Sequence, residues 1–204
     1  MASRFATASR AILGKWRPGT SQRTASCPSI AADDRSQKEP PEFEATFYAR
    51  IWQEGRNPKG MLAETYLRGR CLELPFADSP RFVRFHPRCP FRQEHFPALI
   101  SLIRNIETDK PQAIQRTALH PDGKAVKRNG KTLPMSGGAI KIDDDADVAQ
   151  GLCVGEGLET CLAGRQMGFA PAWSLLSAGG IAGFPALAGL EGLTVFLEND
   201  VRSR

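Results

Sequence analysis

The chain has 204 residues, of which 41% are hydrophobic and 24% charged, and its net charge is +5. This length and composition are typical of one ordinary domain or of a small module followed by a medium one, with a sizeable apolar core. No apolar run approaches the roughly 18 residues of a membrane helix, so we expect a soluble, cytoplasmic protein without membrane contact. Five scattered cysteines without a C-x-x-C pair argue against a disulfide framework or a zinc module and predict reduced thiols.

The positive charge is concentrated at the N-terminus. Residues 1–31 contain five basic residues and no acid, so residues 32–204 have no net charge. Residues 1–41 are rich in Ser, Arg, Ala and Pro without a sustained period, which predicts a disordered basic leader. Such a segment is also typical of an organellar transit peptide or of an arm that contacts nucleic-acid phosphates.

Residues 42–150 are predicted to form a mixed module of helices and strands. Phe43, Phe47 and Ile51 recur at helical spacing and predict a helix that ends near the breaker run at 55–60, and a second helix is predicted over residues 61–70. Short β-like stretches bounded by Pro, Gly and Asp follow. They cover residues 81–87, 97–105, 112–120 and 138–142.

Basic residues recur throughout this module, and three of them are candidates for binding nucleic-acid or nucleotide phosphates. They are Arg116, Lys124 and Lys127. The plainer interpretation is a solvated sheet edge with lysines in its turns. His86, His95 and His120 have no second ligand at metal spacing, so we interpret them as surface or packing residues.

From residue 151 the pattern becomes strand, helix, strand, short helix, strand, which predicts a parallel α/β layer over residues 151–204. The expected strands cover 151–154, 171–178 and 193–200, and the expected helices cover 157–168 and 179–189. In such sheets the functional residues lie beyond the carboxyl ends of the strands.

Three strand ends bring polar or flexible groups to this edge. Glu156 follows the first strand, a glycine turn with Gly179 and Gly180 follows the second, and Glu198 and Asp200 end the third. A few carboxylates with waters and substrate phosphates are typical ligands of Mg²⁺, and Mn²⁺ is the alternative ion. Glu156 suits a general acid or base, and the glycine turn suits a phosphate.

Each feature also has a structural interpretation. An acidic pair that ends a strand is usually a solvated turn, and Glu159 in the first turn of a helix is a favourable placement for the helix dipole. The run Gly155, Gly157, Thr160 is an incomplete dinucleotide-binding fingerprint, so a nucleotide-binding oxidoreductase is a weak third possibility.

Taken together, the stretches "CVGEGLETCLAG", "WSLLSAGGIAGF" and "LTVFLEND" resemble the Toprim domain, the catalytic core shared by bacterial-type primases and topoisomerases. Upstream, "IWQEG", "AETYLRGR", "VRFHPRCP", "PALISLIRN", "QRTALHPDGK" and "GGAIKI" resemble, in that order, the module that precedes Toprim in primases and primase–helicases of plasmids, phages and integrated elements. The resemblance covers about residues 43–200.

The resemblance implies a Mg²⁺-dependent nucleotidyltransferase that synthesises primers in the replication of a mobile element or phage. Glu156 matches the acid/base glutamate, and Glu198 with Asp200 matches the metal-binding D-x-D pair, with Glu in place of the first Asp. Glu159 matches a second acid of less defined role. The implied partners are single-stranded DNA, nucleoside triphosphates and a helicase.

In the family the chain continues after the acidic strand, whereas this sequence stops at Arg204. We therefore expect an incomplete Toprim layer with an unpaired strand and an uncovered apolar face. The alternative function is accordingly a catalytically inactive remnant that only binds nucleic acid.

Overall fold

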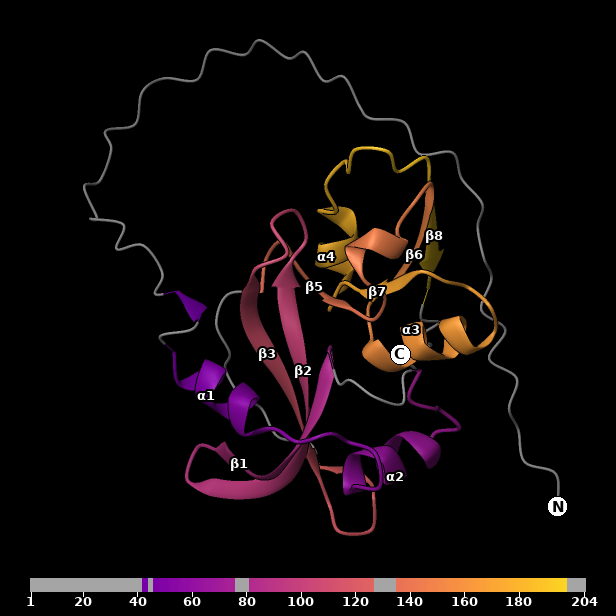
Figure 1. Cartoon of the computed structure of the whole chain (residues 1–204). Coiled ribbons are helices and arrows are strands. Elements are labelled where there is room, and N and C mark those ends of the chain that lie inside the picture. Colours follow the sequence, from indigo (N-terminus) through magenta and orange to yellow (C-terminus); the bar gives the residue numbers. More distant parts are fainter. Residues whose placement is uncertain (1–41, 44–45, 76–80, 127–134, 198–204) are drawn as a thin grey trace, which may run out of the picture.

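The computed structural model describes residues 42–43, 46–75, 81–126 and 135–197. Within these ranges the chain forms a mixed α/β structure around one curled, eight-stranded sheet (Figure 1). The strand order is β4-β3-β2-β5-β7-β6-β8, and β1 pairs with β2. None of the described helices is long and apolar enough to cross a membrane. The α/β prediction is therefore confirmed, whereas the predicted leader at 1–41 lies outside the described residues.

Two short helices precede the sheet, as predicted. They are α1 (Phe47–Glu54) and α2 (Leu62–Arg68). Helix α1 begins later than its apolar spacing indicated, because the Thr46 hydroxyl caps it by accepting a hydrogen bond from the Ala49 N–H at 3.3 Å. Ile51 of α1 and Leu67 of α2 are buried and belong to different hydrophobic clusters.

The first half of the sheet is an antiparallel meander. It contains β1 (Val83–Phe91), β2 (Glu94–Asn105), β3 (Pro111–Leu119) and β4 (Ala125–Val126). Strand β1 extends past Pro87 and Pro90, beyond the predicted end. Its ladder with β2 is irregular between His86 and Cys89, which is where a strand tolerates residues that cannot donate a hydrogen bond.

Strand β5 (Gly138–Lys141) joins the two halves of the sheet. It pairs antiparallel with the end of β2 and with β7 (Ala172–Ser174). Beyond β7 lie β6 (Gly151–Gly155) and β8 (Gly192–Phe196), and both β7 and β8 run parallel to β6. The predicted strands of this half are thus present, but β7 is much shorter than residues 171–178.

Helices α3 (Leu158–Gln166) and α4 (Ala178–Ala182) cover opposite faces of the parallel strands. Cys153 of β6 packs in the same cluster as Leu162 of α3, whereas its neighbour Val154 packs in the cluster that Ile181 of α4 joins. This arrangement follows from topology. The connections from β6 to β7 and from β7 to β8 run in opposite directions across the sheet, and right-handed crossovers then lie on opposite faces.

The predicted helix at 179–189 is wrong in extent, because α4 ends at Ala182. Gly183 and Pro185 follow at once, and these residues disfavour continuation of a helix. The chain then returns to β8 in an irregular segment whose apolar side chains are only partly buried. These are Phe184, Leu187 and Leu190, together with Leu193 and Val195 of β8. Whether the layer is incomplete, as the sequence analysis expects, depends on residues after Leu197 and stays a prediction.

The predicted module boundary at residue 150 does not separate two sheets or two cores. One hydrophobic cluster includes Leu67 and Leu99 from the first module together with Cys153, Leu162 and Phe196 from the second. Strand β5, which belongs to the predicted first module, pairs with β7 of the second. The division into two modules therefore stays a prediction. In the structure, residues on both sides of position 150 share one sheet and one hydrophobic cluster.

The described cysteines are free thiols, and three of the four are buried. Burial raises the pKa of Cys89 to about 11, so its thiolate is scarce at neutral pH. We expect Cys71, which is exposed, to react rapidly with Ellman's reagent, whereas Cys89 reacts only after unfolding. The measurement compares thiol release from the native chain and from Cys71→Ser. Equal rapid release from both would contradict the expectation.

Candidate active site

Glu156 is the first residue after β6, the central strand of the three parallel strands. The turn is fixed through its backbone. The Ser174 hydroxyl donates to the Glu156 carbonyl oxygen at 2.8 Å, and the Leu175 N–H donates to the Gly155 carbonyl oxygen at 2.8 Å. Glu156 itself is half-buried. The sequence therefore places a carboxylate on a well-held turn at the carboxyl end of a buried strand.

No described residue forms a hydrogen bond or an ion pair with the Glu156 carboxylate. Gly155 pairs with Phe196 in the parallel ladder, so the chain leaves β8 beside the turn that carries Glu156. In open sheets a crevice forms at the carboxyl ends of neighbouring strands whose connections leave in opposite directions. Glu156 lies at the carboxyl end of β6, beside the end of β8, and the connection that follows β8 lies outside the described residues.

The two predicted metal ligands, Glu198 and Asp200, lie outside the described residues, as does Lys127. Among the described residues, no group of three or more His, Cys, Asp or Glu side chains could hold a metal ion. The predicted magnesium site therefore depends on residues that follow Leu197. Glu156, the predicted general acid or base, is the one carboxylate of this edge that the structure describes.

The glycine turn after β7 is tightly built. Leu176 has a positive φ of 70°, a conformation that costs a branched residue of order 1–3 kcal/mol. Ser177 caps α4, and its hydroxyl accepts the Gly180 N–H at 3.1 Å. That N–H is therefore already engaged within the turn. Gly179 is exposed and remains a predicted phosphate contact.

Gly180 has a packing reason to be glycine. A Cβ there would lie 2.1 Å from the Leu175 carbonyl oxygen, a backbone atom that cannot move without changing the turn. A Cβ at Gly179 would meet only the Ser177 hydroxyl, at an ordinary 3.6 Å.

We expect Gly180→Ala to lower the free energy of unfolding by roughly 1–3 kcal/mol through overpacking, and Gly179→Ala to change it by less than about 0.5 kcal/mol. Urea unfolding of both variants measures the difference. Equal stability of the two would show that the close approach does not constrain the turn.

Glu159 contributes to packing between segments. Its Oε1 accepts a hydrogen bond from the Tyr66 hydroxyl, and its Oε2 lies 2.9 Å from the Arg70 guanidinium. Burial, the hydrogen bond to Glu159 and the negative charge of Glu159 raise the pKa of Tyr66 well above its usual range. The two glutamates three residues apart therefore differ: Glu159 is engaged on both oxygens, whereas the described residues leave Glu156 unengaged.

Two of the predicted phosphate-binding residues of the first module are described. Arg116 of β3 donates to the Pro90 carbonyl oxygen at 2.6 Å and lies over the Tyr48 and Phe91 rings at 5.4 and 5.0 Å. These contacts use Arg116 for packing between β1, β3 and α1. Lys124 lies in the turn between β3 and β4, and its side chain is 82% exposed. Its ammonium lies 3.5 Å from the Asp122 carboxylate, an exposed contact that leaves Lys124 more accessible to a ligand than Arg116.

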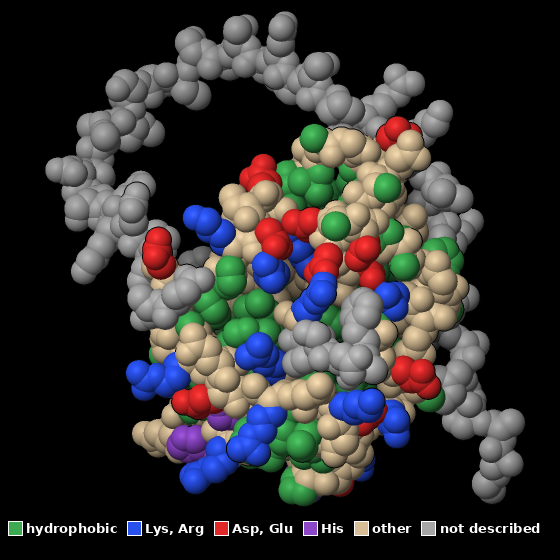
Figure 2. Space-filling view, viewed as in Figure 1, with side chains coloured by type: hydrophobic (Ala, Val, Ile, Leu, Met, Phe, Trp, Pro, Cys, Tyr) green, Lys and Arg blue, Asp and Glu red, His purple; other side chains and the backbone are tan. Residues whose placement is uncertain are grey.

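The sequence analysis missed a charged network beside β5. The Lys141 ammonium, only 3% exposed, lies 2.6 Å from Asp145 and 3.0 Å from Asp109 and packs over the Trp173 ring at 4.6 Å. Buried Asp143 pairs with Arg165 at 2.8 Å. The lysine in the apolar run "GAIKI", followed by four aspartates, was the available signal. Figure 2 shows that acidic and basic side chains are interleaved on one face of the molecule.

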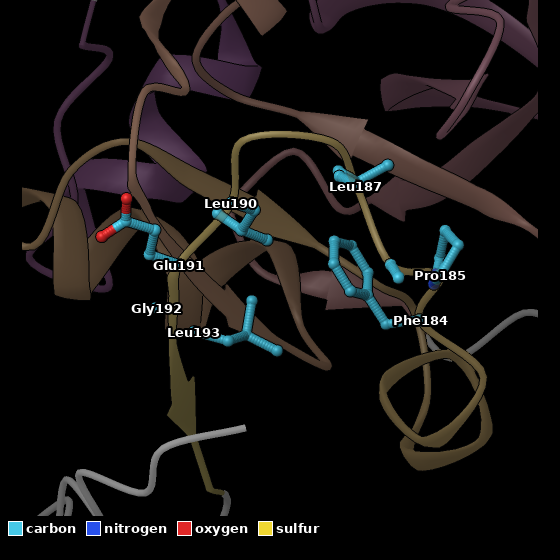
Figure 3. Close-up of a pocket in the computed structure, with 8 residues that line it drawn as sticks. Phe184, Pro185, Leu187, Leu190, Glu191, Gly192 and Leu193 are labelled. Atoms are coloured by element: carbon cyan, nitrogen blue, oxygen red, sulfur yellow. The ribbon is translucent and has the colours of Figure 1, made fainter. Parts of the chain in front are cut away.

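An apolar pocket lies between the segment after α4 and the start of β8 (Figure 3). Phe184, Leu187, Leu190 and Leu193 line it, with Glu191 at its rim. Gly192 begins β8, so the pocket lies toward the amino end of the strand, away from Glu156 at the carboxyl end. It belongs to the incompletely covered face of the sheet.

Comparison with known proteins gives one match, which covers just under half of the chain. Residues 44–141 match the family model of a domain of unknown function, DUF7146. Neither a curated protein nor a solved structure matches the chain. The matched region runs from just before α1 to the end of β5, and β6 with Glu156 lies beyond it. The likeness thus covers most of the predicted first module.

Proposed function

We propose that this protein is a Toprim-type nucleotidyltransferase of the primase class that synthesises primers on single-stranded DNA from nucleoside triphosphates. The observation that carries the proposal is the position of Glu156. Its carboxylate follows the central parallel strand, has no partner among the described residues, and lies beside the end of β8. A half-buried carboxylate at the carboxyl edge of parallel strands is suited to act as general acid or base.

In this proposal Glu198 and Asp200 would hold Mg²⁺ or Mn²⁺ through carboxylate oxygens. The ion, when bound, supplies charge neutralisation for phosphoryl transfer. Glu156, whose carboxylate has no described partner, would accept the proton of the attacking primer hydroxyl. The hydroxyl oxygen would bond to the α-phosphorus of the nucleoside triphosphate as the bond to the β-phosphate breaks and pyrophosphate leaves. The backbone bonds from Ser174 and Leu175 keep the turn in place during this transfer.

The strained turn at Leu176 adds support. Residues with unfavourable backbone conformations persist where surrounding structure holds them, and they gather at ligand-binding sites. This turn ends β7, the strand next to β6, so it borders the same edge of the sheet as Glu156. Exposed Gly179 offers a backbone approach for a substrate phosphate there.

Calorimetric titration with Mn²⁺, followed by a primer-synthesis assay on single-stranded DNA, tests the proposal. We expect saturable Mn²⁺ binding that is lost in Asp200→Asn, and metal-dependent primers from the unaltered chain only. Absence of metal binding in every variant would overturn the proposal. The same result with a steep, salt-dependent affinity for DNA would favour the nucleic-acid-binding alternative.

A further inference from the structure

Two segments far apart in the chain meet at the start of α3. Tyr66 of α2 donates to Oε1 of Glu159, and Arg70, just beyond α2, lies 2.9 Å from Oε2. The Arg70 guanidinium also lies over the Tyr66 ring, 6.0 Å from its centroid. We refer to Tyr66, Arg70 and Glu159 as the α2–α3 clamp. Both carboxylate oxygens of Glu159 are used within it.

The other end of α3 is held by the same segment. The Gln166 side chain accepts from the Glu73 N–H at 2.7 Å and donates to the Cys71 carbonyl oxygen at 3.2 Å. The chain that follows α2 is therefore bonded to both the first and the last turn of α3. The orientation of α3 depends on this segment as well as on the strands beneath it.

The first turn of α3 lacks a side-chain cap, so the contacts of Glu159 with Tyr66 and Arg70 are important for holding it. Gly157 is the N-cap of α3 and supplies no side-chain hydrogen bond to the free N–H groups of the helix start. Glu156 directly precedes it, and its own carboxylate is not held by any described residue. The direction of the Glu156 side chain therefore depends on the backbone between β6 and α3. Glu159 holds the first turn of α3, which directly follows this backbone.

We propose that Tyr66 is a positioning residue for Glu156: by holding Glu159, it fixes the first turn of α3 and so the turn that presents the Glu156 carboxylate. The inference rests on the proposed function and adds a link to it. Tyr66 and Arg70 belong to the region that matches the domain of unknown function, whereas Glu156 lies outside it. The matched module thereby contributes to the geometry of the edge that carries Glu156.

Tyr66 suits this role because it is a permanent donor. Its side chain is 4% exposed, and its raised pKa keeps the hydroxyl protonated throughout the pH range of an assay. Removing the hydroxyl alone leaves the ring in the cluster that it shares with Leu67 and Leu162. Tyr66→Phe therefore changes the clamp with little change in packing.

The experiment compares Tyr66→Phe with Tyr48→Phe. Tyr48, in α1, packs against the cluster of Ile51 and Phe91, which is separate from the cluster that contains Tyr66. For Tyr66→Phe we expect kcat of primer synthesis to fall about tenfold with an unchanged KM for nucleotide, because only the reacting geometry is affected. Hydrogen exchange in residues 156–162 should also become faster. Tyr48→Phe should change neither quantity.

A double-variant cycle separates positioning from general stability. Assays are run well below the unfolding transition, and Tyr66→Phe combined with Glu159→Gln should lower kcat no further than Glu159→Gln alone. A Tyr66→Phe variant with unaltered kcat, or with unaltered exchange at 156–162, overturns the positioning role while the proposed function stands. An unaltered chain that makes no primer overturns the proposed function, and the positioning role with it.

Discussion

Replacing Glu156 by Gln is expected to lower kcat of primer synthesis by roughly 10²–10⁴-fold, the usual effect of losing a general acid or base. The amide keeps the size and the hydrogen-bonding capacity of the side chain but cannot accept the proton. Stability should not fall, because no described residue pairs with the Glu156 carboxylate. The measurement is steady-state primer synthesis together with thermal unfolding.

Glu159→Gln is the matched control, since it makes the same change three residues later. Glu159 bonds Tyr66 and pairs with Arg70, so this variant should lose about 1–2 kcal/mol of stability. Its loss of activity should be smaller than that of Glu156→Gln. Unaltered primer synthesis in Glu156→Gln would contradict the assignment of Glu156 as acid or base. A larger activity loss in Glu159→Gln would move the role to that residue.

The spacing of apolar residues and the positions of Gly, Pro and Asp were sufficient to predict most of the helices and strands. Apolar spacing predicted α1 and α2, and the alternation of apolar runs with Gly, Pro and Asp predicted α3 and every strand except the two-residue β4. Such patterns report burial on one face, which is the main determinant of secondary structure. The ends were less predictable. Helix α1 begins after its Thr46 cap rather than at Phe43, and β7 ends before the positive-φ residue Leu176 rather than at residue 178.

The site was partly predictable. The position of Glu156 follows from the order of strands, because a residue after a parallel strand must lie at its carboxyl edge. The role of Arg116 did not follow, since a basic residue in a β-like stretch has the same pattern whether it meets solvent or aromatic rings. Its contacts with Tyr48 and Phe91 depend on the pairing of β1 with β2 and of β2 with β3.

The two glutamates illustrate the same limit. Glu156 and Glu159 both lie near the start of α3, and local sequence gives each a favourable interaction with the helix dipole. What separates them is Tyr66, 93 residues before Glu159. Long-range contacts of this kind have no signature in a single sequence, so the division of roles became visible only in the folded chain.

Arg165→Met is expected to have the largest effect on stability, about 3 kcal/mol, because it leaves a buried carboxylate without its cation. The Asp143 side chain is only 5% exposed, and the Arg165 Nη2 lies 2.8 Å from its Oδ1. Within the described structure, the Asp143 carboxylate then keeps only the hydrogen bond from the Ala172 N–H, at 2.8 Å. Urea unfolding measures the loss.

Lys141→Met is the informative comparison, since it also removes a cation from a charged network and puts an apolar chain in its place. Here the cation is the buried partner, at 3% exposure, whereas Asp109 and Asp145 are 42% and 46% exposed. Both carboxylates can regain water, and Met can pack against Trp173, so the cost should be near 1 kcal/mol. Equal losses in the two variants would mean that the number of bonds, rather than the burial of the group left behind, determines the cost.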